Sequence, residues 1–295
     1  MGTKNAIEDQ DAGNVIALEH VNIAVPDQRL ATLFYLAGLG ATRDPYMMVG
    51  LENMWINVGE QQFHLPNREA QVIPGHIGIV VEDLAALQDR LAAIEEGLAG
   101  TRFQWSVHDG YVAATGPWGN QFHCHPPGPE FGDMLMGIPY VEFRVRPGVA
   151  DGIGQFYKQL MGASYSPTRN GEGGVARVRV GRDQELVFRE TAEPIPPYDG
   201  HHVAIYTANF SSPYAELKRR DLVTEEVDSL PANTSRSQYR FRDIVDPKTG
   251  ELLLSLEHEV RSLYHPMYLR PLVTRNPSQS IRGYSRGRDA LTAAP

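Results

Sequence analysis

The sequence predicts an α+β fold built from four βαβββ modules, and two observations support this. Four segments share an alternating strand, a polar turn and an amphipathic helix, and they begin at His20, His76, Tyr140 and His202, at intervals of 56, 64 and 62 residues. Further short strands with period-two alternation and glycine turns follow each helix. One such module cannot bury both its sheet and its helix, so we expect the modules to pair into two curved, cleft-forming mixed sheets with helices on the outer face.

The first half of the chain is expected to hold two modules, at residues 17–66 and 74–127, and to end at 127. In the first, strand 20–25 precedes a helix that runs to about Ala37, and strands 53–58 and 62–65 close the module. In the second, strand 76–81 precedes a helix with Leu84, Leu87 and Leu91 on one face, and strands 111–115 and 121–125 flank a Gly-Pro-Trp-Gly-Asn turn.

The second half, residues 138–260, follows a proline-rich linker and repeats the pattern at residues 138–192 and 200–260. Its predicted strands are 140–145, 175–180, 185–189, 202–207, 238–244 and 251–257. Residues 1–16 are expected to form a flexible N-terminus. Residues 261–295 form a C-terminal extension without periodicity, and its end at 285–295 is expected to be disordered.

Composition and charge exclude several classes of function. A hydrophobic fraction of 42% and a charged fraction of 21% are typical of a soluble globular protein. The net charge of −9 argues against general affinity for nucleic acid or anionic membranes. No stretch has the length of a transmembrane segment, the N-terminus is not signal-like, and Cys124 is the only cysteine, so we expect a cytoplasmic protein. Cys124 is interpreted as a small strand residue rather than as a nucleophile.

Histidines recur at matching positions of the repeat. Val21, Ile23 and Val25 are apolar and take the core face, so His20 points to the opposite, concave face of its strand. The same reasoning applies to the histidines that open the second and fourth modules. The closing strands of the first two modules share the letters Gln-Phe-His, which adds a second histidine to each. Imidazole is the commonest metal ligand, so the pattern predicts a metal site made from His20, His64, His76 and His123.

These motifs resemble those of the vicinal oxygen chelate superfamily, which includes glyoxalases, bleomycin-resistance proteins and extradiol dioxygenases. The openings His-Val-Asn-Ile-Ala-Val-Pro-Asp at 20–27 and His-Ile-Gly-Ile-Val-Val-Glu-Asp at 76–83 look like the family's first strand. The segment Trp-Gly-Asn-Gln-Phe-His at 118–123 is similar to its closing motif, with His123 where glutamate is usual. The resemblance covers roughly residues 17–259. It implies one divalent metal ion (Fe, Zn, Ni, Co or Mn), a small-molecule substrate and a possible homodimer.

The second half departs from this pattern. Tyr140 occupies the expected first-strand ligand position of the third module, and counting from the turn glycine places Leu254 at the closing position of the fourth. Glu257 lies three residues further on. The catalytic residues are not assigned by the sequence, and the candidates are Glu142, which faces the same way as Tyr140, Tyr239, which could line a pocket, and His125, which shares a strand face with the histidine at 123.

Two pairing schemes follow from these positions. If modules one and two pair, His20, His64, His76 and His123 converge on one metal. If modules one and four pair, His20, His64 and His202 converge, with Glu257 as a possible fourth ligand. We favour the first scheme because its four positions align without adjustment.

Three functions are compatible with such a site. The leading one is a metal-dependent enzyme acting on a small substrate with adjacent oxygens, with a preference for a ring-cleaving dioxygenase. The alternatives are a glyoxalase-like isomerase, epimerase or lyase, and a non-catalytic binding protein of the bleomycin-resistance type. The last would use an aromatic cleft, for which the candidates are Trp55, Trp105, Trp118 and Tyr111.

Overall fold

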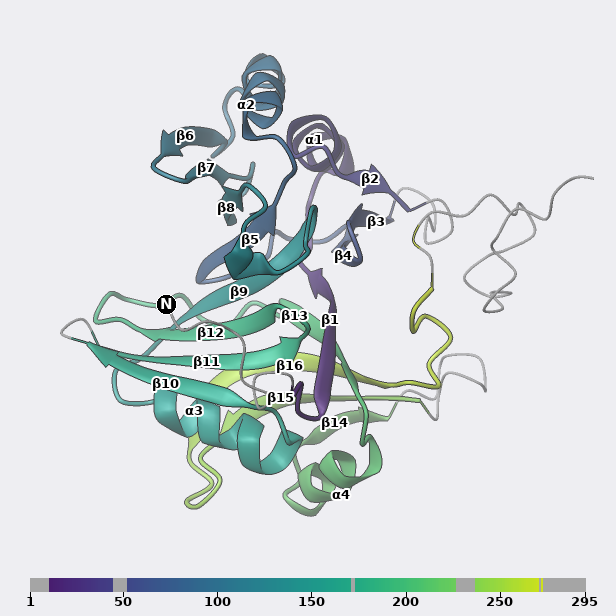
Figure 1. The fold of residues 1–295 in the computed structure, drawn as a ribbon, viewed down its shortest axis with the longest axis vertical. Coiled ribbons are helices and arrows are strands. Elements are labelled where there is room, and N and C mark those ends of the chain that lie inside the picture. Colours follow the sequence, from purple (N-terminus) through teal and green to yellow (C-terminus); the bar gives the residue numbers. More distant parts are fainter. Residues whose placement is uncertain (1–10, 45–51, 171–172, 227–236, 271, 273–295) are drawn as a thin grey trace, which may run out of the picture.

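All four βαβββ modules are present, which confirms the predicted fold class. The computed structural model describes residues 11–44, 52–170, 173–226, 237–270 and 272. The segment 285–295, predicted to be disordered, lies outside the described residues. Within these residues sixteen strands form two eight-stranded mixed sheets, and the four α-helices are short (Figure 1).

The elements of the first half follow the repeat. The first module consists of β1 (Val15–Asn22), α1 (Gln28–Ala31) with a π-helical continuation (Thr32–Gly38), β2 (Thr42–Arg43), β3 (Asn53–Val58) and β4 (Gln61–Pro66). The second consists of β5 (Gly75–Val80), α2 (Leu84–Ala93), β6 (Gln104–His108), β7 (Tyr111–Thr115) and β8 (Gln121–His125). The polar turns of the repeat are helix N-caps, because Asp27 and Asp83 each accept hydrogen bonds from two backbone N–H groups of the first helical turn. β1 begins at Val15, two residues before the predicted start of the module.

The second half has the same order of elements. The third module consists of β9 (Gly137–Val145), α3 (Ala150–Phe156) with a π-helical continuation (Tyr157–Met161), β10 (Tyr165–Asn170), β11 (Gly173–Gly181) and β12 (Gln184–Glu190). The fourth consists of β13 (His202–Thr207), α4 (Ser211–Arg219), β14 (Val223–Glu226), β15 (Gln238–Val245) and β16 (Leu252–Ser262).

The pairing of the modules differs from the scheme that the sequence favoured. The first sheet has the order β14-β15-β16-β13-β1-β4-β3-β2 and so combines modules four and one. The second sheet has the order β10-β11-β12-β9-β5-β8-β7-β6 and combines modules three and two. β1 pairs with β13, and β5 with β9, both antiparallel. The favoured pairing of modules one and two is therefore wrong, because main-chain hydrogen bonds join each of these modules to a partner from the other half.

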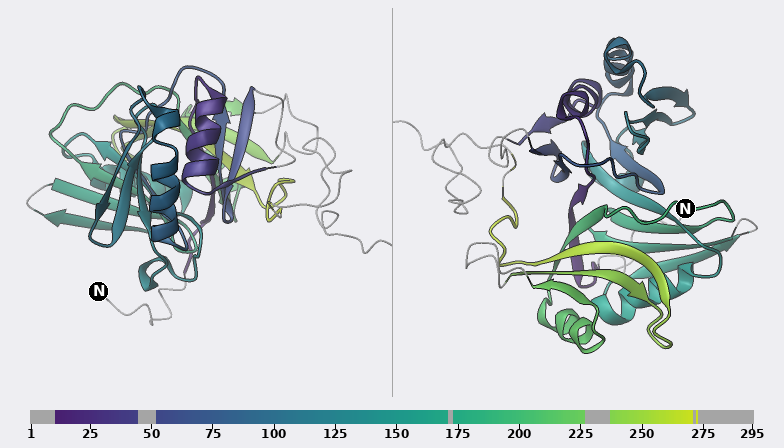
Figure 2. Two further views of the ribbon diagram at one scale, coloured as in Figure 1. Left: turned by 90° about the horizontal axis from the view of Figure 1, so that it is seen from above. Right: turned by 180° about the vertical axis from the view of Figure 1, so that it is seen from behind.

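Modules one and two meet through their apolar faces instead. The ring of Phe122 from β8 lies 5.3 Å from that of Phe34 and 6.0 Å from that of Phe63 on β4. A Cβ on Gly38 would lie 2.5 Å from the Ile94 side chain, so the first helix and the end of the second pack closely (Figure 2). These contacts join the two sheets through one continuous hydrophobic core.

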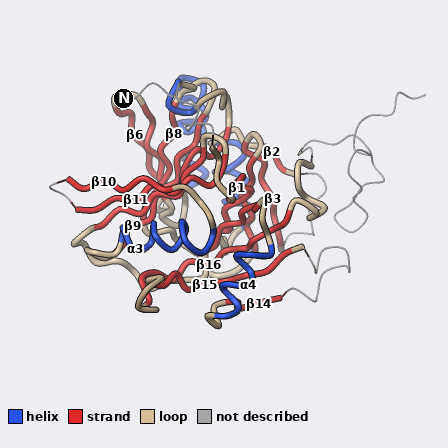
Figure 3. Tube along the Cα trace, turned by 60° about the horizontal axis from the view of Figure 1, so that its bottom comes forward, coloured by secondary structure: helices blue, strands red, loops and turns tan. Residues whose placement is uncertain are grey.

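The helices and the concave faces lie on opposite sides of the sheets. Val21, Ile23 and Val25 are buried in the core as predicted. Strands make up most of the fold, and the helices pack on the core side of the sheets (Figure 3). The concave face of each sheet is left for polar side chains. No helix in the described parts of the chain is long and apolar enough to span a membrane.

Candidate metal centre

Three histidines converge on the concave face of the first sheet. Asn22 on β1 pairs with His64 on β4 and with His202 on β13, so these side chains share the face of His20, two residues earlier. The ring of His20 lies 5.8 Å from each of the other two rings. One ligand nitrogen of each histidine lies within 4.8 Å of the others, and among the described residues this is the one group of three potential metal ligands so close together.

The other two predicted ligands lie elsewhere. His76 on β5 and His123 on β8 belong to the second sheet, where their rings stack 3.9 Å apart. The structure therefore does not bring His20, His64, His76 and His123 together. It brings together His20, His64, His202 and Glu257, the residues of the alternative scheme.

Each of these three converging histidines is held through one ring nitrogen. Nδ1 of His20 donates to Glu19 at 2.9 Å, and Nε2 of His64 donates to Asn53 at 2.5 Å. Nδ1 of His202 lies 3.5 Å from a carboxylate oxygen of Glu257. Such contacts fix the tautomer and turn the other nitrogen, with its lone pair, toward the space between the rings.

The inner nitrogens fit a metal ion. Nε2 of His20 and Nε2 of His202 are buried and have no hydrogen-bond partner. Buried polar atoms are normally paired, so two orphaned lone pairs beside a third imidazole are the arrangement that a cation would complete. Burial, together with the neighbouring His20, holds the pKa values of His64 and His202 well below the usual 6.5, so both rings are neutral and able to ligate.

Sequence reasoning missed the acidic residue that faces these nitrogens. On β16, Glu257 pairs with His202 and Glu259 pairs with Ala204, so both carboxylates share the histidine face. Glu259 lies 4.0 Å from Nε2 of His202, the orphaned nitrogen, whereas Glu257 lies beside Nδ1. Glu259 also holds the position in module four that His64 holds in module one. His64 lies opposite the residue two positions after His20, and Glu259 lies opposite the residue two positions after His202. The structure thus makes Glu259 the candidate ligand and Glu257 an orienting partner.

A buried ionic cluster surrounds the centre. Arg261 contacts both Glu19 and Glu259, and Arg240 donates to Glu257 at 2.5 Å and to Glu259 at 2.6 Å. Burial opposes ionisation of Glu19, but Arg261 and the hydrogen bond to the neighbouring histidine outweigh it and lower its pKa to about 2. Burial of Glu259 is likewise outweighed, chiefly by Arg261, and its pKa stays well below the usual value. Three carboxylates face two guanidiniums, which leaves one surplus negative charge beside neutral imidazoles and favours a cation.

Aromatic and C-terminal residues enclose this centre. Trp55 on β3 stacks on His64 with a ring separation of 4.0 Å and meets His20 edge-on at 4.9 Å. The segment after β16 reaches back along the first sheet, where Arg270 forms a buried 2.8 Å ion pair with Asp44. The backbone carbonyl of Leu272 accepts from the Asn57 side chain at 2.6 Å. His20, His202 and Glu259 are accordingly buried, whereas His64 is partly exposed.

The predicted catalytic candidates do not lie at this centre. Glu142 and His125 belong to the second sheet. Tyr239 was expected to line a pocket, but it is buried in the core against Phe210 and Tyr214. Strand alternation explains this, since Arg240 takes the concave face and its neighbour must face the helix.

Solved structures with a similar fold were found by comparison, although no family model and no curated sequence matches the chain. Glyoxalase I from Zea mays aligns with a TM-score of 0.58 at 17% identity, covering 83% of this chain and 92% of that one. A proposed dioxygenase from Bacillus subtilis aligns with a TM-score of 0.56 at 14% identity, covering 88% and 87%.

The chain has the vicinal oxygen chelate fold. At these identities the likeness concerns the fold alone and fixes no activity. The concave face of the first sheet offers four matching positions, two on first strands and two on closing strands. In the first sheet of this chain those positions are His20, His64, His202 and Glu259.

Proposed function

We propose that the chain is a metal-dependent enzyme that binds one divalent ion at His20, His64, His202 and Glu259 and acts on a small substrate with adjacent oxygens. One observation carries this proposal: Nε2 of His20 and Nε2 of His202 are buried without a hydrogen-bond partner, and a carboxylate oxygen of Glu259 lies 4.0 Å from the second of these nitrogens. A purely structural cluster of this kind would leave buried polar atoms unpaired at a cost of about 1–3 kcal/mol each.

A bound divalent metal supplies Lewis acidity toward two neighbouring substrate oxygens and, as Fe(II), redox chemistry with O₂. The chain's own residues prepare the site for it. Glu19, Asn53 and Glu257 lock the imidazoles in the ligating tautomer. Trp55 provides a flat wall beside two of the histidines and excludes water from the centre.

Within this class we favour a ring-cleaving dioxygenase over a glyoxalase-like isomerase, epimerase or lyase. The four proposed ligands contain the two-histidine, one-carboxylate set of non-heme iron oxygenases, with one further histidine, and a six-coordinate ion would keep two positions open. The second group of reactions needs a general base with a pKa near the working pH. Glu19, Glu257 and Glu259 are each held by an arginine, and the pKa values of Glu19 and Glu259 are lowered, so those two carboxylates are weak bases.

The test is to load the purified protein anaerobically with Fe(II), add a catechol and measure oxygen uptake together with the absorbance of the ring-opened product. Oxygen uptake matched mole for mole by product supports the dioxygenase. A parallel reaction follows exchange of deuterium from D₂O into the carbon beside the carbonyl of a hydroxy ketone. Exchange without oxygen uptake would assign the isomerase class instead. Binding of these compounds with neither reaction would assign the non-catalytic alternative.

A further inference from the structure

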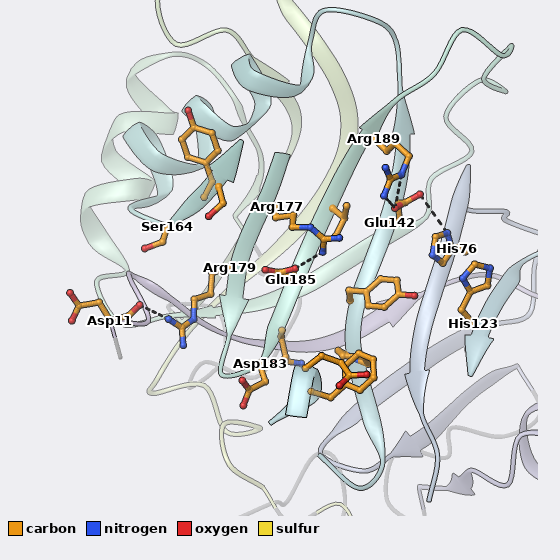
Figure 4. Close-up of a pocket in the computed structure, with 18 residues that line it drawn as sticks. Asp11, His76, His123, Glu142, Ser164, Arg177, Arg179, Asp183, Glu185 and Arg189 are labelled. Carbon is orange, nitrogen blue, oxygen red and sulfur yellow. Dashed lines mark hydrogen bonds and ion pairs between the residues drawn. The ribbon is translucent and has the colours of Figure 1, made fainter. Parts of the chain in front are cut away.

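The concave face of the second sheet encloses a separate cavity of about 770 Å³ (Figure 4). Its walls come from β5 and from β8 to β12, with Asp11 and the segment around Phe131, and none of these strands belongs to the metal centre. A volume of this size is sufficient for a small organic molecule.

This second cleft keeps only half of a metal ligand set. His76 and His123 hold the positions that His20 and His64 hold in the first sheet. His123 lies opposite the residue two positions after His76, as His64 does relative to His20. Tyr140 takes the first-strand position of module three. Val187 takes the closing-strand position, because it pairs with Glu142, two residues after Tyr140. Among the described residues no group of three or more potential ligands gathers here. We therefore expect a ligand of this cleft to bind without a metal.

One side of the cleft offers neutral, oriented imidazoles and aromatic faces. Nδ1 of His76 lies 3.6 Å from Glu142, which in turn accepts from Arg189 at 3.0 Å. The Tyr140 ring lies directly over Gly78, where a Cβ would come within 2.3 Å of it, and its hydroxyl lies 3.0 Å from Nε2 of His125. These side chains form a wall with flat surfaces and hydrogen-bonding edges, and Figure 4 labels His76, His123 and Glu142 in it.

Guanidinium and carboxylate groups line the opposite side, with Arg177 and Arg179 beside Glu185, Asp183 and Asp11. Arg177 and Arg179 stand two residues apart on β11 and both face the cavity (Figure 4). The partner of Arg177 is Glu185 at 2.8 Å, and both side chains are about two-fifths exposed, at 44% and 39%. An exposed pair of this kind stabilises the fold by less than about 1 kcal/mol, so Arg177 can exchange Glu185 for a ligand carboxylate at little cost.

We propose that the second cleft binds a small aromatic carboxylic acid without a metal, with its carboxylate on Arg177 and its ring against Tyr140 beside the His76–His123 pair. The guanidinium matches a carboxylate in two parallel hydrogen bonds, and the aromatic wall covers the ring. The neutral imidazoles accept a hydrogen bond from a ring hydroxyl, since burial lowers the pKa values of His76 and His123. This site does not depend on the metal-dependent activity proposed for the first sheet.

The test is calorimetric titration of the full chain with 4-hydroxybenzoate in EDTA, with 4-hydroxybenzyl alcohol as the matched uncharged ring. We expect saturable binding of one acid per chain and binding of the alcohol at least tenfold weaker. Arg177→Gln should weaken binding of the acid tenfold or more. Arg242→Gln, which changes an exposed arginine on the first sheet, should leave it unchanged.

A further variant separates the two clefts. His202→Ala disrupts the metal centre and should bind 4-hydroxybenzoate as the unchanged protein does. Absence of saturable binding, equal affinity for the acid and the alcohol, or full affinity in Arg177→Gln would each overturn the proposal. Loss of binding in His202→Ala would do the same, because it would place the ligand in the first sheet.

Discussion

Replacing Glu259 with glutamine is expected to weaken metal binding by more than about a hundredfold. Residues that only orient a ligand already change metal affinity by about 10–100-fold, and a carboxylate facing the open nitrogen of His202 should exceed them. Glu257→Gln is the matched comparison, because it removes the same charge from the same strand face but from beside Nδ1. We expect it to stay within the 10–100-fold range.

Stability must be measured alongside affinity for these two variants. Removing one partner of an isolated buried ion pair costs about 3–5 kcal/mol. Here Arg261 keeps Glu19 and Arg240 keeps Glu257 when Glu259 is neutralised, so the loss of unfolding free energy should stay below that range. Affinity is measured by competition with a chromophoric chelator for Co(II) or Zn(II), and unfolding by urea titration in EDTA. A larger loss of affinity in Glu257→Gln than in Glu259→Gln would show that the two roles are assigned the wrong way round.

Three further predictions concern the surroundings of the centre. Tyr157→Phe removes the hydroxyl that lies 2.6 Å from the fully buried Nε2 of His258, and should lower the unfolding free energy by about 1–3 kcal/mol in urea titrations. Burial lowers the pKa of His258 from 6.5 to about 4, so the unfolded state binds the proton first and stability should fall by about 1.4 kcal/mol per pH unit as pH drops through that window. A pH slope that is unchanged in His258→Phe would contradict this. Arg270→Met leaves Asp44 without its buried guanidinium and should cost about 3 kcal/mol in the same assay, where a loss under about 1 kcal/mol would count against the pairing.

The repeat made most of the fold predictable from the sequence. Strand alternation placed Val21, Ile23 and Val25 in the core and His20 on the concave face, and each agrees with the structure. The pairing of modules was not predictable in this way, because the alternation is identical whichever partner completes the sheet. The pairing of modules depends instead on which strand edges form hydrogen bonds with each other. That choice is made by contacts between residues far apart in the sequence, such as those of Phe122 with Phe34 and Phe63.

The candidate site was predicted only in part, and local irregularities explain the omissions. Counting from Gly250 gave Leu254 as the closing position, but β16 is 11 residues long and its register with β15 shifts twice, which moves the facing acid to Glu259. Strict alternation would also place Glu19 on the core side. A register shift between Leu18 and His20 turns it toward the histidine instead, and bulges of this kind leave little trace in one sequence.

Metal content of two histidine variants tests the central claim most directly. The unchanged protein, His202→Ala and His123→Ala are each loaded with Fe(II), freed of excess metal and measured by mass spectrometry. Because a metal site depends on all of its ligands, we expect about one equivalent in His123→Ala and under about a tenth in His202→Ala. Retention of metal in His202→Ala with loss in His123→Ala would contradict a centre built from modules one and four.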